Sequence, residues 1–179
     1  MAAVDIPELD SPRLLTRGAA RKGACRTANA PPRHVLRYDT AAKTELRCIT
    51  QELNDLIARL GVDNGTLLIY SLHTTLGLIV QETSEPNLCE DFVDFLTALV
   101  EDDGHQYKHR CALHPSGTCA EDRFNGPSHV RQLLTNQSLT LDIQGGRLTL
   151  GRWQDVALFE LDGPRQGRQL FVKITPDGR

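Results

Sequence analysis

Long apolar runs are missing from this sequence. None approaches the roughly 18 residues that a membrane-spanning helix needs, so we expect no helical membrane protein. The first ten residues carry acids where a signal peptide would carry bases, so no secretory leader is expected either. The chain also lacks a large excess of either positive or negative charge. A formal net charge of −3 over 179 residues gives no long-range field that would gather phosphate backbones, so we expect no nucleic-acid partner.

Several common catalytic motifs are absent as well. The chain has no glycine-rich phosphate loop, no dinucleotide-binding fingerprint and no nucleophile elbow, which argues against P-loop enzymes, nucleotide-cofactor enzymes and α/β-hydrolases. Disulfide spacing is absent too, because the cysteines are odd in number and irregularly placed, at positions 25, 48, 89, 111 and 119. Such a pattern suits free thiols in a reducing compartment, and it predicts a cytoplasmic protein.

The length favours one domain, because 179 residues suffice for a single well-formed core. Residues 1–33 mix arginine with proline, glycine and alanine and lack periodicity, which predicts a disordered tail before a domain over 34–179. Helical spacing is found over 49–60, from 86 to about 102 and from 127 to about 134. Short strand-like runs fall at 66–72, 76–80, 139–143, 147–150, 156–161 and 170–174.

Helices early and strands late are typical of an α+β fold. We expect an antiparallel or mixed β-sheet, forming a sandwich or half-barrel, with two to three helices packed on it. Gly145-Gly146 predicts a tight hairpin, and the turn at 162–167 predicts a further reversal, which together make a meander. The second helix should bury a stripe made of Phe92, Phe95, Leu96, Leu99 and Val100. Trp153, the only tryptophan, should close the core beside the hairpin.

Titratable groups accompany the apolar segment from 70 to 92. His73 ends one strand-like run, Glu82 ends the next, and Asp91 shares a helix side with Leu88 and Phe95. Each has an ordinary structural interpretation. The imidazole could be satisfied by a backbone carbonyl, the helical acid could be favoured by the macrodipole, and Glu82 could be solvated.

Two more histidines, His109 in "HQYKH" and His129 in "NGPSH", extend the set. Three neutral imidazoles hold a zinc-type ion with one position left open, although the spacings of 36 and 20 residues match no local metal signature. A rival ligand set, Cys111, His114 and Cys119, has a wider gap than zinc knuckles use, and a loop with two free thiols is commoner. Arg165, at a reversal, could grip a carboxylate or phosphate in bidentate fashion or lie in solvent.

The order of these motifs resembles the YjbQ-like family, also called secondary thiamine-phosphate synthases. The resemblance is carried by "HTT" at 73–75, Glu82, Asp91, "YKH" at 107–109, "PSH" at 127–129, "GRWQ" at 151–154 and "DGPR" at 162–165. It spans residues 34 to 175. The segment 110–124 is longer than usual for the family, which puts the substrate in question if that segment folds over the site.

The resemblance implies an α+β domain that assembles as a homotrimer, with its histidines in a polar cleft near a subunit boundary. It also implies a weak activity that joins hydroxymethyl-pyrimidine diphosphate to thiazole phosphate and releases pyrophosphate. By motif, the catalytic candidates are His73, Asp91, His109 and His129, and the substrate-binding candidates are Thr74, Glu82, Trp153, Gln154 and Arg165. The three histidines would bind metal or diphosphate, and Asp91 and Glu82 would orient them.

A divalent cofactor is expected on this hypothesis, zinc-type if three histidines bind it or Mg²⁺ if a diphosphate is the substrate, and no nucleotide cofactor is expected. Two alternatives use the same residues. One is a non-catalytic trimeric binding protein for a small phosphorylated metabolite or anion. The other is a structural trimer whose histidines pair across the interface.

Overall fold

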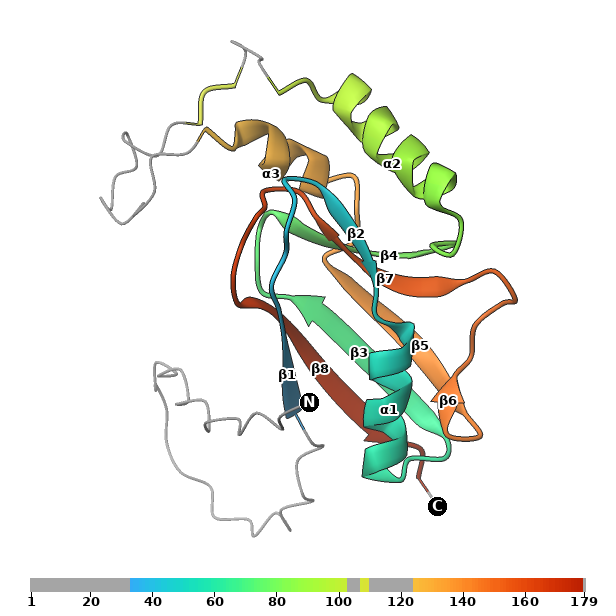
Figure 1. Ribbon diagram of the computed structural model, residues 1–179. Helices are drawn as coiled ribbons and strands as arrows, with labels where there is room; N and C mark the ends of the chain where they lie inside the picture. Colours follow the sequence, from blue (N-terminus) through green and yellow to red (C-terminus); the bar gives the residue numbers. More distant parts are fainter. Residues whose placement is uncertain (1–32, 103–106, 110–123, 179) are drawn as a thin grey trace, which may run out of the picture. The chain divides into compact units, whose positions relative to one another are not determined.

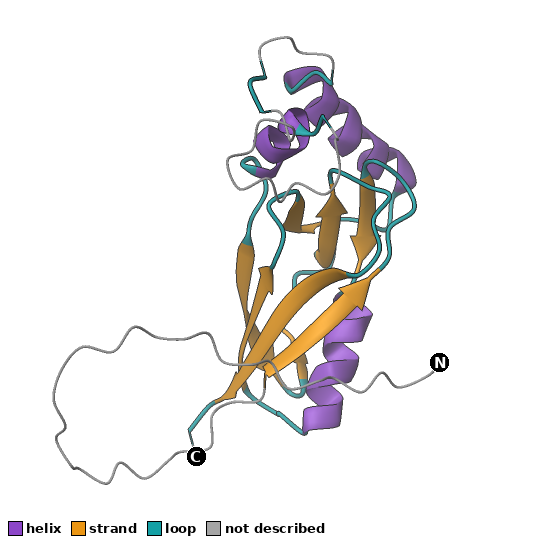
Figure 2. Ribbon diagram, turned by 90° about the vertical axis from the view of Figure 1, so that its left-hand side faces the viewer, coloured by secondary structure: helices purple, strands orange, loops and turns teal. Residues whose placement is uncertain are grey.

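The computed structural model describes residues 33–102, 107–109 and 124–178. The expected tail therefore lies outside the described residues, apart from Arg33, and so does the cysteine-containing segment with Cys111, His114 and Cys119. The described part is an α+β domain built from two antiparallel sheets with helices packed on them (Figures 1 and 2), as the sequence predicted. None of its helices is long and apolar enough to cross a membrane.

One sheet has five strands in the order β1-β8-β3-β5-β6, and every neighbouring pair is antiparallel. Its strands are β1 (Arg33–Tyr38), β8 (Arg168–Pro176), β3 (Gly65–Ser71), β5 (Ser138–Gln144) and β6 (Arg147–Leu148). The predicted hairpin joins β5 to β6, and both turn glycines have positive φ, 57° at Gly145 and 76° at Gly146. A two-residue turn of this kind needs that conformation, which glycine adopts without steric cost.

The other sheet has three strands in the order β2-β7-β4. They are β2 (Glu45–Cys48), β7 (Asp155–Glu160) and β4 (Leu76–Gln81). The predicted meander is therefore wrong, because β7 and β8 follow each other in the chain but belong to different sheets. The physical reason is that both edges of β7 are taken, one by β2 and one by β4. β1 and β2 are strands that the sequence analysis did not predict.

The main core lies between the two sheets and α1 (Thr50–Leu60). Leu53, Leu56 and Ile57 form the buried face of this helix, which ends at Gly61 with φ of 64°. β7 explains how a second core arises. Val156 and Leu158 face the main core, whereas Phe159 belongs to a smaller cluster under the second helix.

That helix, α2 (Pro86–Leu99), begins at Glu85, whose carboxylate accepts hydrogen bonds from the backbone N–H groups of Asn87 and Leu88. Its predicted buried stripe is only partly right. Leu96 and Val100 are buried, but Phe95 is 65% exposed and Leu99 58% exposed. The helix rests on the three-stranded sheet through one narrow face, so the neighbouring part of its apolar surface stays outside.

The third helix, α3 (Gly126–Gln132), is short and lies beside α2 in both ribbon views (Figures 1 and 2). Its chain then returns to the sheet by a backbone pair between Leu78 and Asn136. We expected Trp153 to close the core, and this prediction is wrong. Its side chain is 59% exposed, and the guanidinium of Arg152 lies 4.7 Å from its ring centre. In Figure 1 the connection between β6 and β7 loops out to the side of the sheets, which is consistent with an indole at the surface.

Candidate functional site

The site is built where the β3–β4 loop meets the β7–β8 loop. The two loops are joined by register, since Leu76 pairs with Glu160, and by a hydrogen bond from the Leu161 N–H to the Thr75 carbonyl at 3.2 Å. His73 leaves the end of β3 inside this junction. Its Nε2 accepts a hydrogen bond from the Gln169 N–H at 2.8 Å. A neutral His73 therefore carries its proton on Nδ1, because Nε2 is the acceptor.

His109 and His129 come together although 20 residues separate them. Their ring centres are 5.0 Å apart and the rings meet edge to face at 77°. His129 projects from α3 and is hydrogen-bonded to the backbone of Thr74, which connects it to the β3–β4 loop. The segment with His109 rests directly on α3, because a Cβ added at Gly126 would come within 3.0 Å of Tyr107 Cβ. Glycine at this position lets the two segments approach closely.

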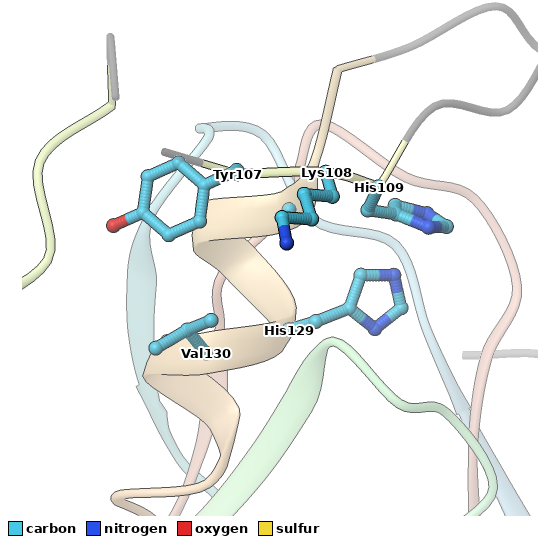
Figure 3. A pocket seen from close by; sticks show the side chains of 6 residues that line it. Tyr107, Lys108, His109, His129 and Val130 are labelled. Carbon is cyan, nitrogen blue, oxygen red and sulfur yellow. The ribbon is translucent and has the colours of Figure 1, made fainter. Parts of the chain in front are cut away.

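A cavity of about 460 Å³ lies beside this pair of rings, and Figure 3 shows the side chains that line it. They are Tyr107, Lys108, His109, Gly126, His129 and Val130. In the close-up, the Lys108 amine lies between the Tyr107 ring and Val130 on one side and the two imidazoles on the other. The cavity therefore combines one fixed cation and two titratable rings with an apolar side.

Burial lowers the pKa of His129, and the neighbouring His109 lowers it further, while Asp162 and the hydrogen bond to Thr74 act in the opposite direction. Burial also lowers the pKa of His73, helped by Arg168 and Arg165 and opposed by Glu160. Both rings are consequently neutral at pH 7 in the absence of a ligand. A bound anion would favour the protonated form of either ring.

A buried ion pair lies beneath the site. Glu160 is fully buried and accepts hydrogen bonds from two nitrogens of the Arg168 guanidinium, with 2.6 Å between Nε and Oε2. Thr40 Oγ1 donates to the same carboxylate at 3.0 Å, and Arg168 Nη2 also donates to Thr75 Oγ1 at 3.0 Å. Because both charges are paired and hydrogen-bonded, the pair holds the β3–β4 loop against the start of β8. Neither Glu160 nor Arg168 was among the predicted site residues.

Asp162 is a second acid that the sequence analysis missed. It is 7% exposed, and its Oδ2 accepts hydrogen bonds from Arg165 Nη2 at 2.6 Å and from Asn125 Nδ2 at 3.0 Å. Arg165, which was expected to grip a substrate, donates in addition to the Asp162 carbonyl through Nε at 3.0 Å. The signal was present in the quoted "DGPR" motif, whose first residue is this acid.

The remaining predicted residues lie elsewhere in the chain. Gln81 pairs with Asp155 at the end of β4 opposite to the Leu76–Glu160 pair, about 17 Å away at the usual rise of a strand. Glu82 follows Gln81 and Gln154 precedes Asp155, so both are at that far end, and Trp153 is next to them. Gln154 uses its side-chain oxygen to accept from the Gly151 N–H at 2.8 Å. Asp91 is exposed on α2.

The structure thus brings together His73, Thr74, His109, His129 and Arg165. It does not bring Glu82, Asp91, Trp153 or Gln154 to them within one chain. Consequently Glu82 and Asp91 do not orient these imidazoles inside a single protomer.

The expected three-histidine metal site is not assembled by the described residues. Within 33–102, 107–109 and 124–178, no group of three or more histidine, cysteine, aspartate or glutamate side chains is arranged to hold a metal ion. His73 directs Nε2 to a backbone amide instead. These residues therefore do not fit a three-imidazole zinc centre. A bound divalent ion stays a prediction, and elemental analysis of the purified protein would check it.

A family model described as UPF0047 protein YjbQ-like matches residues 34–177, so the chain belongs to this family. Among curated relatives, a UPF0047 protein of Methanocaldococcus jannaschii is 32% identical over 138 residues, covering 77% of this chain and 90% of the relative. UPF0047 protein YugU of Bacillus subtilis is 28% identical over 139 residues, covering 78% and 96%.

Solved structures agree on the fold. A YbjQ-like protein of unknown function from Sulfolobus solfataricus superimposes with a TM-score of 0.68 at 25% identity, covering 82% of this chain and 97% of the other. A hypothetical protein from Aeropyrum pernix gives 0.68 at 27% identity, covering 82% and 99%.

These findings correct the expected activity. The assignment of thiamine-phosphate synthesis from the resemblance is wrong, because the relatives are named only as UPF0047 proteins and the Sulfolobus solfataricus structure is described as being of unknown function. The transferase assignment falls with it. Membership of this family therefore shows the fold of the chain.

Proposed function

We propose that this protein binds a small phosphorylated metabolite, or another small anion, in the cavity beside His109 and His129. The observation that carries the proposal is the convergence of Lys108 with two imidazoles on one cavity of about 460 Å³. Pockets of a few hundred Å³ are typical for small molecules, and a few convergent polar groups usually set their specificity.

The chemistry of these groups favours an anion. Lys108 supplies a positive charge, while His109 and His129 can donate N–H groups to an anion. No acidic side chain lines the cavity among the described residues. The net charge of −3 means that attraction has to be local, which suits a small ligand better than a polyanion.

Binding titrations test this proposal. Calorimetry with glycerol phosphate should give saturable binding to the wild type, and Lys108→Met should weaken it by roughly tenfold or more, because a charge-assisted hydrogen bond is lost. Lys173→Met on β8 is the matched control, since it removes the same charge away from the cavity. Equal affinities of the wild type and Lys108→Met would refute the proposal.

The proposed assembly is a homotrimer, in the cytoplasm. Exposed apolar side chains on and next to the two helices support association between copies: Phe95, Leu99, Leu133 and Leu134. Irregularly spaced cysteines support a reducing compartment. Sedimentation equilibrium should give about three times the chain mass of 19.9 kDa. A monomer at micromolar concentration would contradict the assembly without affecting the anion site.

A further inference from the structure

A buried guanidinium on α3 has no part in the proposed binding site. The side chain of Arg131 is 1% exposed. Its Nε and Nη2 both donate to the carbonyl of Val100, at 3.1 Å and 2.5 Å, and its Nη1 lies 3.1 Å from Asp102 Oδ1. All three guanidinium nitrogens therefore hold the residues that directly follow α2.

The Asp102 end of this arrangement is reinforced from the β1–β2 loop. Lys43 Nζ lies 2.8 Å from the same Asp102 oxygen. Burial raises the pKa of Asp102, but the hydrogen bonds and charges of Lys43 and Arg131 lower it by more, so the net shift is downward and the carboxylate stays ionised at neutral pH. We call Arg131, Asp102 and Lys43 the clamp.

The clamp is close in sequence to both walls of the cavity. His129 and Val130 immediately precede Arg131 on the same helix, whereas Tyr107 follows Asp102 by only five residues. Five residues reach at most about 18 Å when fully extended. The cavity wall made of residues 107–109 is therefore tethered to the clamp by at most about 18 Å of chain, and it rests on the first turn of α3 at Gly126.

We propose that Arg131 is a positioning residue, which fixes the wall of residues 107–109 against α3 and so holds His109 beside His129. This inference rests on the proposed function only for its effect on anion affinity. One short helix presents His129 to the cavity and, through Arg131, anchors the chain that delivers His109. Losing the anchor lets the wall shift while the sheets keep their core.

The direct test is the distance between the two rings. In the wild type, an NMR cross-relaxation signal between ring protons of His109 and His129 is expected from ring centres 5.0 Å apart. Arg131→Met should abolish it, and Lys43→Met, which leaves Arg131 and Asp102 in place, should weaken it. Glycerol phosphate affinity should fall in the same order, by roughly tenfold or more for Arg131→Met. Lys173→Met is the control for charge.

The outcomes separate the two ideas. A ring-ring signal that persists in Arg131→Met, with only a lower unfolding temperature, would overturn the positioning role and leave a purely structural clamp. If Arg131→Met does not fold, Arg131→Lys, which keeps the charge but loses the guanidinium that reaches both Val100 and Asp102, answers the same question: an unchanged ring-ring signal there overturns the role. A signal that is present in the wild type and lost in Arg131→Met, together with a wild type that does not bind glycerol phosphate, would support the positioning role and reject the anion site.

Discussion

The histidine side chains of the site differ in the contacts that their rings make. The Nε2 atom of His73 accepts a hydrogen bond from the Gln169 amide, and the ring lies next to the buried Glu160–Arg168 pair. Its role is therefore to hold the β3–β4 and β7–β8 loops together. His129 faces the cavity with His109 beside it. The pKa of His73 and the pKa of His129 are both lowered, and burial is the main cause for each. Both rings are therefore groups that folding keeps neutral.

This makes stability depend on pH. A histidine whose pKa is lowered by folding binds protons more readily in the unfolded chain, so its contribution is complete above its ordinary value of about 6.5 and is lost as the pH falls below it. The free energy of unfolding should thus decrease from pH 7.5 to pH 5. Denaturant titrations of His73→Asn should show a smaller decrease than those of the wild type. An identical pH dependence in the two proteins would show that the lowered pKa of His73 does not contribute to stability.

Arg168 shows how far residue patterns can lead. It lies in phase with Leu170, Val172 and Ile174, so the alternation that predicted β8 also places a guanidinium on the inward face. A charge at such a position requires a buried partner, and this could have been predicted from the sequence. The partner itself could not, because Glu160 belongs to a strand of the other sheet and looked like an ordinary strand end.

Removing Arg168 should be costly. Arg168→Met leaves the fully buried Glu160 carboxylate without its counter-charge, which costs about 3–5 kcal/mol for a broken buried pair. Arg33→Met, at an exposed position on β1, should change stability by no more than about 0.5 kcal/mol. Urea unfolding measures both, and similar values for the two variants would show that the pair is not essential.

At the scale of elements, the sequence-based prediction was right where one residue type decides the local backbone conformation. Gly145-Gly146 form the predicted hairpin turn, because glycine adopts positive φ without steric cost. The predicted buried face of α2 was too wide, because periodicity identifies an apolar face of a helix but not how much of that face a neighbouring element covers. The strands β1 and β2 were not predicted because both lie at the edges of their sheets and mix charged with apolar residues, so they carry no clear apolar run.

The two apolar sides of α2 should respond differently to substitution. Leu96→Ala removes a buried side chain from the cluster under the helix and should destabilise the domain by about 2–5 kcal/mol. Phe95→Ser changes a side chain that is 65% exposed, so it should leave the unfolding of dissociated chains nearly unchanged but weaken association. Unfolding and sedimentation on both variants check this. Equal loss of stability would mean that α2 buries Phe95 in the single chain.

For the whole molecule, the predicted α+β class was right. Apart from Asp91 on α2, the predicted site residues divide into two groups at opposite ends of β4. Sequence order alone could not separate them, since Glu82 is nearer to His73 in the chain than His109 is. The fold reverses this relation by bringing the segment 107–109 back onto α3. The proposed anion site therefore depends on tertiary contacts rather than on one local motif.

The most direct test of the anion site observes the imidazoles themselves. In a titration of the full-length protein with glycerol phosphate at pH 7, followed by NMR of the histidine side chains, the His109 and His129 resonances should shift together and saturate. His34 on β1 is the internal reference and should not move. Resonances of His109 and His129 that stay unchanged at saturating ligand, or that move no more than those of His34, would contradict the account.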